Sequence, residues 1–367
     1  MKYRLAFIIT LSACLPVTAD VIYIDAAAKG ANTGITWANA HPTLAGAIAS
    51  AQAGDELWVA AGTYGPIELK SGVRVYGGFA GTETAAASAD PETNKTYIDG
   101  GGIGRAVLSI DDDSSTVLRG FHIVDGRAPD RHEPGGGLYL SNSNALFVRC
   151  VFANNAAEFA GGAAANYFGG SPKFVNCRFE SNGGGENVPM SHGAGAFFNH
   201  QTGGTPEFVN CLFYGNRAME GGAVVSLKNA ISFVNCTFAD NVATKARGHA
   251  LFDNRGEAVV RNCILWNGPA ASSAAGEIYN HEGRSPTNIA HSNVRGGWPG
   301  EGNFDADPLF VNAAGGDFRL REGSPCRDVG SESALPTGTA NVDLAGNTRV
   351  QNDVVDIGAY EWAPPMP

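Results

Sequence analysis

A short motif centred on an asparagine–cysteine pair recurs along the chain and constrains the fold more than any other feature. The clearest copy, EFVNCLF, begins at Glu207, and the other copies read KFVNCRF, SFVNCTF, VVRNCIL and FVRCVF. The spacings between the cysteines are 27, 34, 25 and 27 residues, and these cysteines are Cys150, Cys177, Cys211, Cys236 and Cys263. An asparagine beside a turn follows each copy, at Asn154, Asn182, Asn216, Asn241 and Asn267. Strand-rich repeats of this length, without helical periodicity, predict an all-β solenoid with one repeat per coil.

In such a solenoid, equivalent residues of successive coils should stack about 4.8 Å apart. We expect two buried phenylalanine columns, one of Phe174, Phe208 and Phe233 and one of Phe152, Phe179, Phe213 and Phe238. The motif asparagines should form an amide ladder at a bend, and they are Asn176, Asn210, Asn235 and Asn262. The cysteines should act as small buried apolar residues with free thiols. Vertical disulfides remain an alternative on distance alone, whereas the spacing lacks the CxxC pairs typical of zinc sites.

The repeat also resembles a known architecture. A GGA strand followed by FVNCxFxxN is similar to right-handed parallel β-helix proteins, particularly the polymorphic outer-membrane-protein type of repeat. Residues 23–64 resemble the opening of secreted bacterial β-helix proteins, in which a short helix, here about residues 43–52 with Leu44, Ile48 and Ala51 on one face, covers the core. The segment 315–362, with DFRLREGSPCRDVG and DIGAYEW, resembles the C-terminal module called choice-of-anchor Q. The resemblance implies an all-β, right-handed parallel β-helix with an N-terminal capping helix.

The N-terminus has the pattern of a secretion signal. Lys2 and Arg4 precede an apolar run, and small residues end it near Ala19. Cleavage at a lipoprotein box with lipid attached to Cys14 is the alternative, so the protein is secreted or periplasmic, or anchored to the outer membrane. No other stretch reaches the roughly 18 apolar residues that a membrane helix needs. The formal net charge is -11, which argues against nucleic acid as a partner.

The chain divides into four expected parts. Residues 1–19 form the signal, 20–64 the N-terminal cap, 65–311 the coils, and 312–367 a module that closes the C-terminal end of the solenoid. The 34-residue step between cysteines contains an insertion at 183–192. We expect a monomer, because both ends of the solenoid would be covered against edge-to-edge pairing.

Strand alternation suggests which residues of the first strand in each coil face outward. The third and fifth positions are apolar throughout and should face inward. The second position should form a shallow floor and comprises Gly137, Gly162, Gly195, Gly222 and His249. The fourth should be an outward apolar column of Tyr139, Ala164, Phe197, Val224 and Leu251, and the sixth a polar rim of Ser141, Asn166, Asn199, Ser226 and Asp253. This arrangement fits either a groove for an extended sugar chain or a surface buried under a loop, for which the insertion is the candidate.

The turn before this strand carries most of the charge, and two interpretations of it remain open. Register places Glu220 below Arg247, which predicts an exposed ion pair worth at most about 1 kcal/mol. The family resemblance instead implies β-elimination on a uronate, with Lys245 or His249 as base and Arg247 and Arg217 holding the carboxylate. In that interpretation calcium is held by Glu220 and Asp253, and the substrate-binding residues are Tyr139, Phe197, His192, Asn199 and Asp253.

No complete signature of a known lyase or hydrolase appears. The run Asp111–Asp113 is expected to cap a turn, with calcium binding as the alternative, and the run from Asp130 to Glu133 lacks the proline of the related epimerase motif. We therefore expect an exported β-helix protein that binds or acts on an extended, acidic polysaccharide, by lyase-like β-elimination if it is an enzyme. The alternative is a non-catalytic adhesin or structural repeat protein. No cofactor is certain, and calcium is the one candidate.

Overall fold

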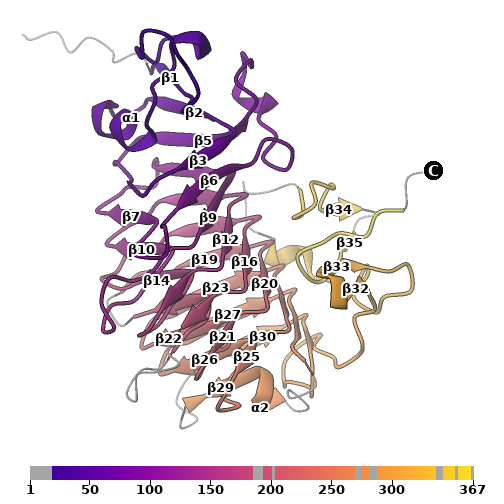
Figure 1. Cartoon of the computed structure of the whole chain (residues 1–367). Coiled ribbons are helices and arrows are strands. Elements are labelled where there is room, and N and C mark those ends of the chain that lie inside the picture. The colour runs from indigo at the N-terminus through magenta and orange to yellow at the C-terminus, as the bar shows by residue number, and fades with distance from the viewer. Residues whose placement is uncertain are drawn as a thin grey trace, which may run out of the picture.

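The computed structural model describes residues 19–184, 193–200, 203–268, 274–281, 287–335, 342–351 and 354–364. Within them the chain winds as a parallel β-helix, and nearly every strand pairs with the equivalent strand one coil away (Figure 1). All pairings inside the coils are parallel, so each repeat of the sequence is one turn of the winding. The all-β solenoid predicted from the asparagine–cysteine repeat is confirmed.

Four stacked parallel sheets form the walls of the described coils. The ten-stranded sheet contains β1 (Val21–Ile24), β2 (Glu56–Ala60), β5 (Arg74–Phe79), β8 (Val117–Arg119), β11 (Leu146–Val148), β15 (Lys173–Val175), β19 (Glu207–Val209), β23 (Ala230–Val234), β27 (Glu257–Arg261) and β30 (Asn288–Ala290). The eight-stranded sheet contains β4 (Ile67–Glu68), β7 (Val107–Ile110), β10 (Leu138–Ser141), β14 (Ala164–Asn166), β18 (Phe197–Asn199), β22 (Val224–Leu227), β26 (Leu251–Asn254) and β29 (Ile278–Asn280).

The other two walls are narrower. The nine-stranded sheet contains β3 (Gly62–Tyr64), β6 (Thr96–Asp99), β9 (Phe121–Val124), β12 (Val151–Ala153), β16 (Arg178–Glu180), β20 (Leu212–Tyr214), β24 (Thr237–Ala239), β28 (Ile264–Trp266) and β31 (Asn293–Val294). The four-stranded sheet contains β13 (Ala156–Ala157), β17 (Gly183–Gly184), β21 (Arg217–Ala218) and β25 (Val242–Ala243). Each regular coil therefore passes through the ten-, nine-, four- and eight-stranded sheets in turn.

The phenylalanine columns predicted from the repeat line the core. Phe208 stacks on Phe174 with ring centroids 4.8 Å apart and on Phe233 at 5.1 Å. The second column has centroid spacings of 4.9, 4.7 and 4.6 Å along Phe152, Phe179, Phe213 and Phe238. All five motif cysteines are buried with free thiols, as predicted. Burial raises the pKa of the Cys150 and Cys211 thiols well above the usual range, so these thiols are unreactive packing groups.

The motif asparagine sits at the sharp bend between the ten-stranded and nine-stranded sheets. Asn176, Asn210 and Asn235 all have left-handed backbone angles with φ of 52–53°. Asparagine is among the few residues that adopt this conformation readily. The predicted ladder is present between Asn235 and Asn210, where Nδ2 donates to Oδ1 at 3.2 Å. Asn210 also donates outward to the carbonyl of Val342, so this column anchors the C-terminal segment.

A continuous amide ladder forms at the next bend instead. Its members are Asn155, Asn182, Asn216, Asn241 and Asn267. Each of the first four donates its backbone N–H and its Nδ2–H to the Oδ1 of the next. The alignment gave Asn154 as the turn asparagine of the first coil, but Asn155 is the residue that bonds to Asn182 in this ladder.

Helix α1 (Leu44–Ser50) covers the N-terminal end of the core, as predicted. Leu44 and Ile48 are both 2% exposed and belong to the main apolar cluster, together with Ala51. At the other end of the stack lies the short helix α2 (Ala274–Glu277). Short 3₁₀ turns occur at Trp37–Asn39, Ala86–Ser88, Ala313–Gly315 and Glu332–Ala334. None of the helices in the described ranges is long and apolar enough to cross a membrane.

The C-terminal segment does not lie where we expected it. It contains two antiparallel pairs, β32 (Phe310–Asn312) with β33 (Asp317–Leu320) and β34 (Val350–Gln351) with β35 (Val354–Val355). Figure 1 shows its described residues along the flank of the solenoid rather than over the last coil. The segment lies there because it buries apolar side chains on the outside of the nine-stranded sheet, namely Leu212, Ala239 and Ile264. The residues of the segment that cover them are Phe310, Phe318, Leu320 and Ile357.

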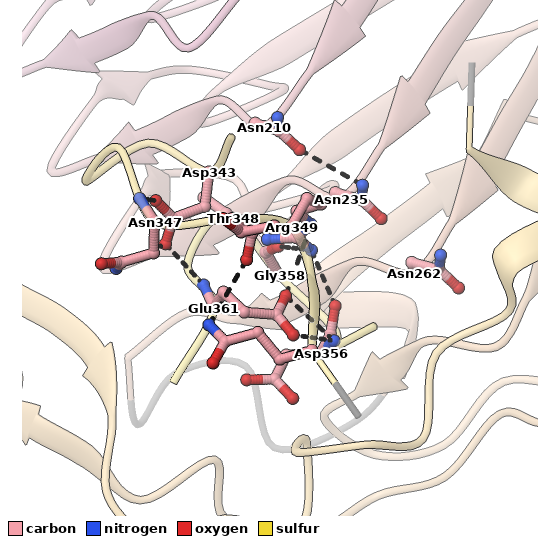
Figure 2. A network of polar contacts seen from close by, with 12 residues as sticks. Asn210, Asn235, Asn262, Asp343, Asn347, Thr348, Arg349, Asp356, Gly358 and Glu361 are labelled. Atoms are coloured by element: carbon pink, nitrogen blue, oxygen red, sulfur yellow. Dashed lines mark hydrogen bonds and ion pairs between the residues drawn. The ribbon is translucent and has the colours of Figure 1, made fainter. Parts of the chain in front are cut away.

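A polar network holds this segment together (Figure 2). Buried Arg349 donates through Nη2 to the carbonyls of Asp356 at 2.7 Å and Gly358 at 2.6 Å. Its Nε lies 3.7 Å from the carboxylate of Glu361, whose pKa burial raises to about 8. Asp343 accepts the backbone N–H of Glu361 at 2.7 Å. The DIGAYEW motif therefore supplies the two carbonyls and the carboxylate that surround the Arg349 guanidinium.

Candidate functional site

The structure turns one predicted surface column inward. Phe197 is fully buried and packs in the core against Phe208, with ring centroids 4.9 Å apart. Asn199 is also fully buried, and its Nδ2 donates to Ser226 Oγ at 3.1 Å. Asp253 lies in the same inner polar column and accepts from the Gly256 N–H and the Thr287 hydroxyl. The assignment of Phe197, Asn199 and Asp253 to an outward substrate groove is wrong.

The cause of this error is a register shift of one residue. Leu138 pairs with Ala164, not with Ala163 as the sequence comparison assumed. In the first coil the strand begins at Leu138, the third residue of the aligned stretch, whereas in the next two coils it begins at the fourth, at Ala164 and Phe197. Because side chains alternate, a slip of one residue exchanges the two faces. Tyr139 in the first coil keeps its predicted outward position and is half-buried.

The expected glycine floor is a packing contact and not an open surface. A Cβ added at Gly162 would lie 2.3 Å from the carbonyl oxygen of Gly183, and one at Gly195 would lie 2.2 Å from that of Gly222. Real Cβ atoms do not come this close to backbone oxygens. Glycine is required at these positions because the bend that leads into the eight-stranded sheet lies directly against backbone of neighbouring segments. This contact leaves no room for a ligand.

His249, a predicted base, is 3% exposed and holds a structural position. Its Nδ1 accepts the backbone N–H of Ala243 at 3.2 Å, at the last strand of the described four-stranded sheet, β25. The imidazole thereby replaces the pairing that a further strand would supply. Burial lowers the pKa of His249, so the ring is neutral with its proton on Nε2. The lone pair that a general base needs is already used.

The predicted pairing of Glu220 with Arg247 is confirmed, but the pair is not exposed as expected, because Glu220 is buried. Arg247 Nη1 lies 2.8 Å from Glu220 Oε1, and the Arg247 guanidinium lies 5.5 Å from the centre of the Tyr279 ring. Lys245 and Arg217 are exposed on the same side of the molecule. Glu220 therefore pairs with Arg247, and Asp253 accepts hydrogen bonds from Gly256 and Thr287. Within the described ranges, no three histidine, cysteine, aspartate or glutamate side chains are grouped to hold a metal ion. His192 lies outside the described residues.

The outward column of the eight-stranded sheet is buried from β14 to β26. The residues that face outward there are Ala165, Phe198, Val225 and Phe252, which form an apolar cluster apart from the main core. The Phe159 ring packs edge-on against Phe198 at 5.7 Å. Of the two arrangements open from the sequence, a covered surface therefore holds for this column.

Beside this cluster, Tyr139 of β10 and rings that follow β14 and β18 form a more accessible patch. We name Tyr139, Tyr167, Phe168 and His200 the aromatic patch. Tyr167 lies 6.3 Å from Tyr139, 4.7 Å from Phe168 and 4.6 Å from His200, measured between ring centroids. Phe168 is 55% exposed, and the other three rings are half-buried. The analysis of strand positions missed Tyr167, Phe168 and His200 because they follow the strands, directly after Asn166 and Asn199.

Arg105 forms a rigid cationic edge beside the aromatic patch. Its guanidinium lies 4.5 Å from the centre of the Tyr139 ring. It donates to the carbonyls of Gly135 and Pro134 and pairs with Glu133 at 2.5 Å. A cavity of about 350 Å³ continues from Arg105 over Pro66, Ile67, Leu108 and Pro129. Accessible rings, a fixed guanidinium and a shallow apolar depression therefore adjoin one another on this face.

A larger cleft of about 720 Å³ lies on the outside of the ten-stranded sheet, at β27 and β30. Its polar lining includes Arg261, His291 and Glu301, with Ser331 and Ser333 of the C-terminal segment. Arg261 already donates to the carbonyls of Val260 and Asn288. None of the residues that we assigned to a site from the sequence lines this cleft.

Comparison with protein families agrees with the winding. The family described as right-handed β-helix region matches residues 102–294, whereas no curated protein matches the sequence. Among solved structures, pectate lyase Pel9A has 14% identity and a TM-score of 0.46, covering 94% of this chain and 96% of that one. An alginate lyase from Paenibacillus sp. str. FPU-7 has 10% identity and a TM-score of 0.30, covering 78% and 98%. A rhamnogalacturonan lyase has 14% identity and a TM-score of 0.29, covering 75% and 87%. Likenesses of this size transfer no residue role.

Proposed function

The chain belongs to the right-handed β-helix family, and we propose that it binds an extended polysaccharide at the aromatic patch without cleaving it. The observation that carries this proposal is the exposure of Phe168, at 55%, within a group of four rings. Folded proteins bury most of their large apolar side chains, and contiguous exposed ones mark binding surfaces. The described neighbours of Phe168 leave 55% of its surface open to solvent.

The chemistry of the patch suits a sugar chain. The C–H faces of pyranose rings pack on aromatic rings, and the sugar hydroxyls accept hydrogen bonds from a guanidinium. Arg105 is held in place by three partners, so little side-chain entropy is lost when it meets a ligand. Successive coils repeat about every 4.8 Å along this face. A linear polymer can therefore lie across several coils and contact each of them.

Lyase chemistry has less support in the described residues. Of the two candidate bases, His249 is buried with its lone pair in use. Arg247 is paired with Glu220, and the proposed calcium ligands Glu220 and Asp253 have other partners. Of the predicted catalytic residues, Lys245 and Arg217 remain exposed. β-Elimination requires a base held beside a neutralised carboxylate, which two exposed side chains supply less well than an ordered set would.

Affinity electrophoresis tests the proposal. Native gels cast with single neutral or acidic polysaccharides should retard the wild-type protein on at least one of them. Phe168→Ala should remove most of the retardation, because an exposed ring is lost without change to the core. Ile35→Ala is the matched control, since Ile35 is 72% exposed in the N-terminal cap. Equal retardation of wild type and Phe168→Ala would contradict the proposal. Release of unsaturated sugars from any of these polymers would show a lyase instead.

We also propose that the protein works outside the cytoplasm as a monomer. Residues 1–18, including Cys14, lie outside the described residues, so cleavage by signal peptidase and lipidation stay predictions. The polymorphic outer-membrane-protein type of coil and the choice-of-anchor Q type of C-terminal segment are likewise proposed from the resemblance alone. Mass spectrometry of the mature N-terminus would separate cleavage after residue 19 from an acylated Cys14.

A further inference from the structure

One coil breaks the rule that places asparagine at the bend. The motif residue is asparagine in four coils but arginine in the first, at Arg149, and all five are left-handed. Arg149 has φ of 50° there. A left-handed backbone costs a residue other than glycine or asparagine about 1–2 kcal/mol. The arginine side chain therefore lies at a position where the fold alone favours asparagine.

Arg149 lines a cleft that three distant segments build together. The cleft has a volume of about 230 Å³. Its floor is the first regular coils, with Val151 and Arg178 on the outside of the nine-stranded sheet. One wall is the loop 90–92, and the other is the C-terminal segment at 344–345 and Tyr360. The Arg149 guanidinium approaches the turn at Gly346, where an added Cβ would lie 3.3 Å from Nη2.

The charges in this cleft are of both signs. Arg149 has no ion pair or hydrogen bond with a side chain among the described residues, whereas Arg178 pairs through Nε with Glu180 at 3.1 Å. Asp90 and Glu92 lie on the wall that the loop 90–92 forms. Asp90 accepts the backbone N–H groups of Glu92 and Thr93, which fixes its carboxylate at the rim. The C-terminal segment adds the phenol ring of Tyr360.

We propose that this cleft binds one hexuronic acid unit, with the sugar carboxylate held by Arg149 and Arg178. A guanidinium is suited to a carboxylate because it offers parallel N–H donors. The acidic side chains of the opposite wall accept hydrogen bonds from sugar hydroxyls. A bare inorganic anion fits less well, because it brings no hydroxyl that could donate to Asp90 and Glu92. The cleft lies on another wall of the solenoid from the aromatic patch, so this site does not depend on the function proposed there.

The repeat itself supplies the test. Arg149→Asn installs the residue that four coils carry at this bend, so the variant should fold at least as well as wild type. Sodium glucuronate should raise the melting temperature of wild type, and glucose at the same concentration should not, with ionic strength matched by sodium chloride. Arg149→Asn should weaken the affinity for glucuronate about tenfold or more, as expected for lost hydrogen bonds to a charged group. Arg74→Asn, which changes an arginine paired with Glu56 elsewhere, should bind as wild type does.

Three results would overturn this inference. The first is no glucuronate shift in wild type, the second an equal shift in Arg149→Asn, and the third an equal shift by sodium sulfate, which would indicate an unspecific anion effect. Phe168→Ala should keep the glucuronate shift. Loss of polysaccharide retention with an intact glucuronate shift would therefore contradict the aromatic patch alone, and the reverse pattern would contradict this cleft alone.

Discussion

Asn267 donates its backbone N–H and its side-chain Nδ2–H to the two carboxylate oxygens of Glu277, at 2.8 and 2.5 Å. This contact ends the amide ladder that begins at Asn155. In every earlier step, both donors go to the single Oδ1 of the next asparagine. Glu277 therefore replaces the asparagine of a further coil and supplies the acceptors that the ladder needs where it stops.

Glu277 should make the stability of the protein depend on pH. Burial raises the pKa of Glu277 to about 7, and the hydrogen bonds from Asn267 only partly oppose this. A carboxyl whose folded-state pKa is raised contributes stability that is complete below its unfolded pKa and is lost as the pH rises through its folded pKa. Relative to Glu277→Gln, wild type should thus lose about 2–3 kcal/mol of unfolding free energy between pH 5 and pH 8.

Urea unfolding at pH 5, 6, 7 and 8 measures that difference. The variant Glu277→Gln is the reference because its amide does not titrate, so the buried histidines and Glu361 cancel from the comparison. Glu257→Gln, at an exposed position in β27, should follow wild type at each pH. A difference between wild type and Glu277→Gln that is constant with pH would mean that Glu277 does not change its charge in this range.

The ladder should also be sensitive in its middle. Asn216→Ala removes the acceptor of both Asn182 donors, and the Nδ2–H that bonds the Phe179 carbonyl. Buried donors without acceptors are costly, so we expect a loss of about 2–4 kcal/mol in unfolding free energy. Asn144→Ala loses an exposed bond to the Ser171 N–H and should cost far less. Equal effects of the two substitutions in urea unfolding would show that the ladder is not a main support of the coils.

The phenylalanine columns should dominate the core. Phe208 contacts Phe174, Phe197 and Phe233, with ring centroids 4.8–5.1 Å apart. Phe208→Ala should therefore cost about 3–5 kcal/mol. Phe168→Ala removes the same atoms from a ring that is 55% exposed and should leave the unfolding midpoint nearly unchanged. Thermal unfolding followed by circular dichroism distinguishes them, and a large drop for Phe168→Ala would place that ring in the core rather than at a binding surface.

Arg349 should control how the C-terminal segment attaches to the flank. Arg349→Met removes the donor to two backbone carbonyls and leaves Glu361 without its cationic neighbour. Removal of one member of a buried charged pair costs about 3–5 kcal/mol. We expect earlier proteolytic cleavage after residue 312 in this variant, with the coils intact. Arg321→Met, which changes an exposed arginine bonded to the Val311 carbonyl, should be cleaved as wild type is.

The coils could be predicted from the sequence because one bend imposes the same demand in every repeat. A left-handed residue, a small buried residue and a phenylalanine recur at fixed positions, so the stacking of Phe174 on Phe208 follows from alignment alone. The same register placed Glu220 beside Arg247 correctly. These features depend only on counting residues from one coil to the next.

The binding surface could not be predicted in the same way. From the second coil onward the first strand of the coil is shifted by one residue relative to the alignment, which exchanged the inner and outer faces for Phe197 and Asn199. His249 lost its predicted role because the four-stranded sheet ends at β25, a tertiary fact that the repeat does not contain. The flanking position of the C-terminal segment, and the cleft at Arg149, depend on contacts between segments more than 150 residues apart, as in the bond from Asn176 to Val342.

Hydroxyl-radical footprinting tests the central claim, that the aromatic patch is the polysaccharide-binding surface. The protein would be labelled with and without the polymer that retards it most strongly in native gels, and modified side chains located by mass spectrometry. We predict that the polymer protects Tyr139, Tyr167 and Phe168 and leaves the labelling of His291 in the larger cleft unchanged. Protection of His291 with unaltered labelling of Phe168 would contradict the account.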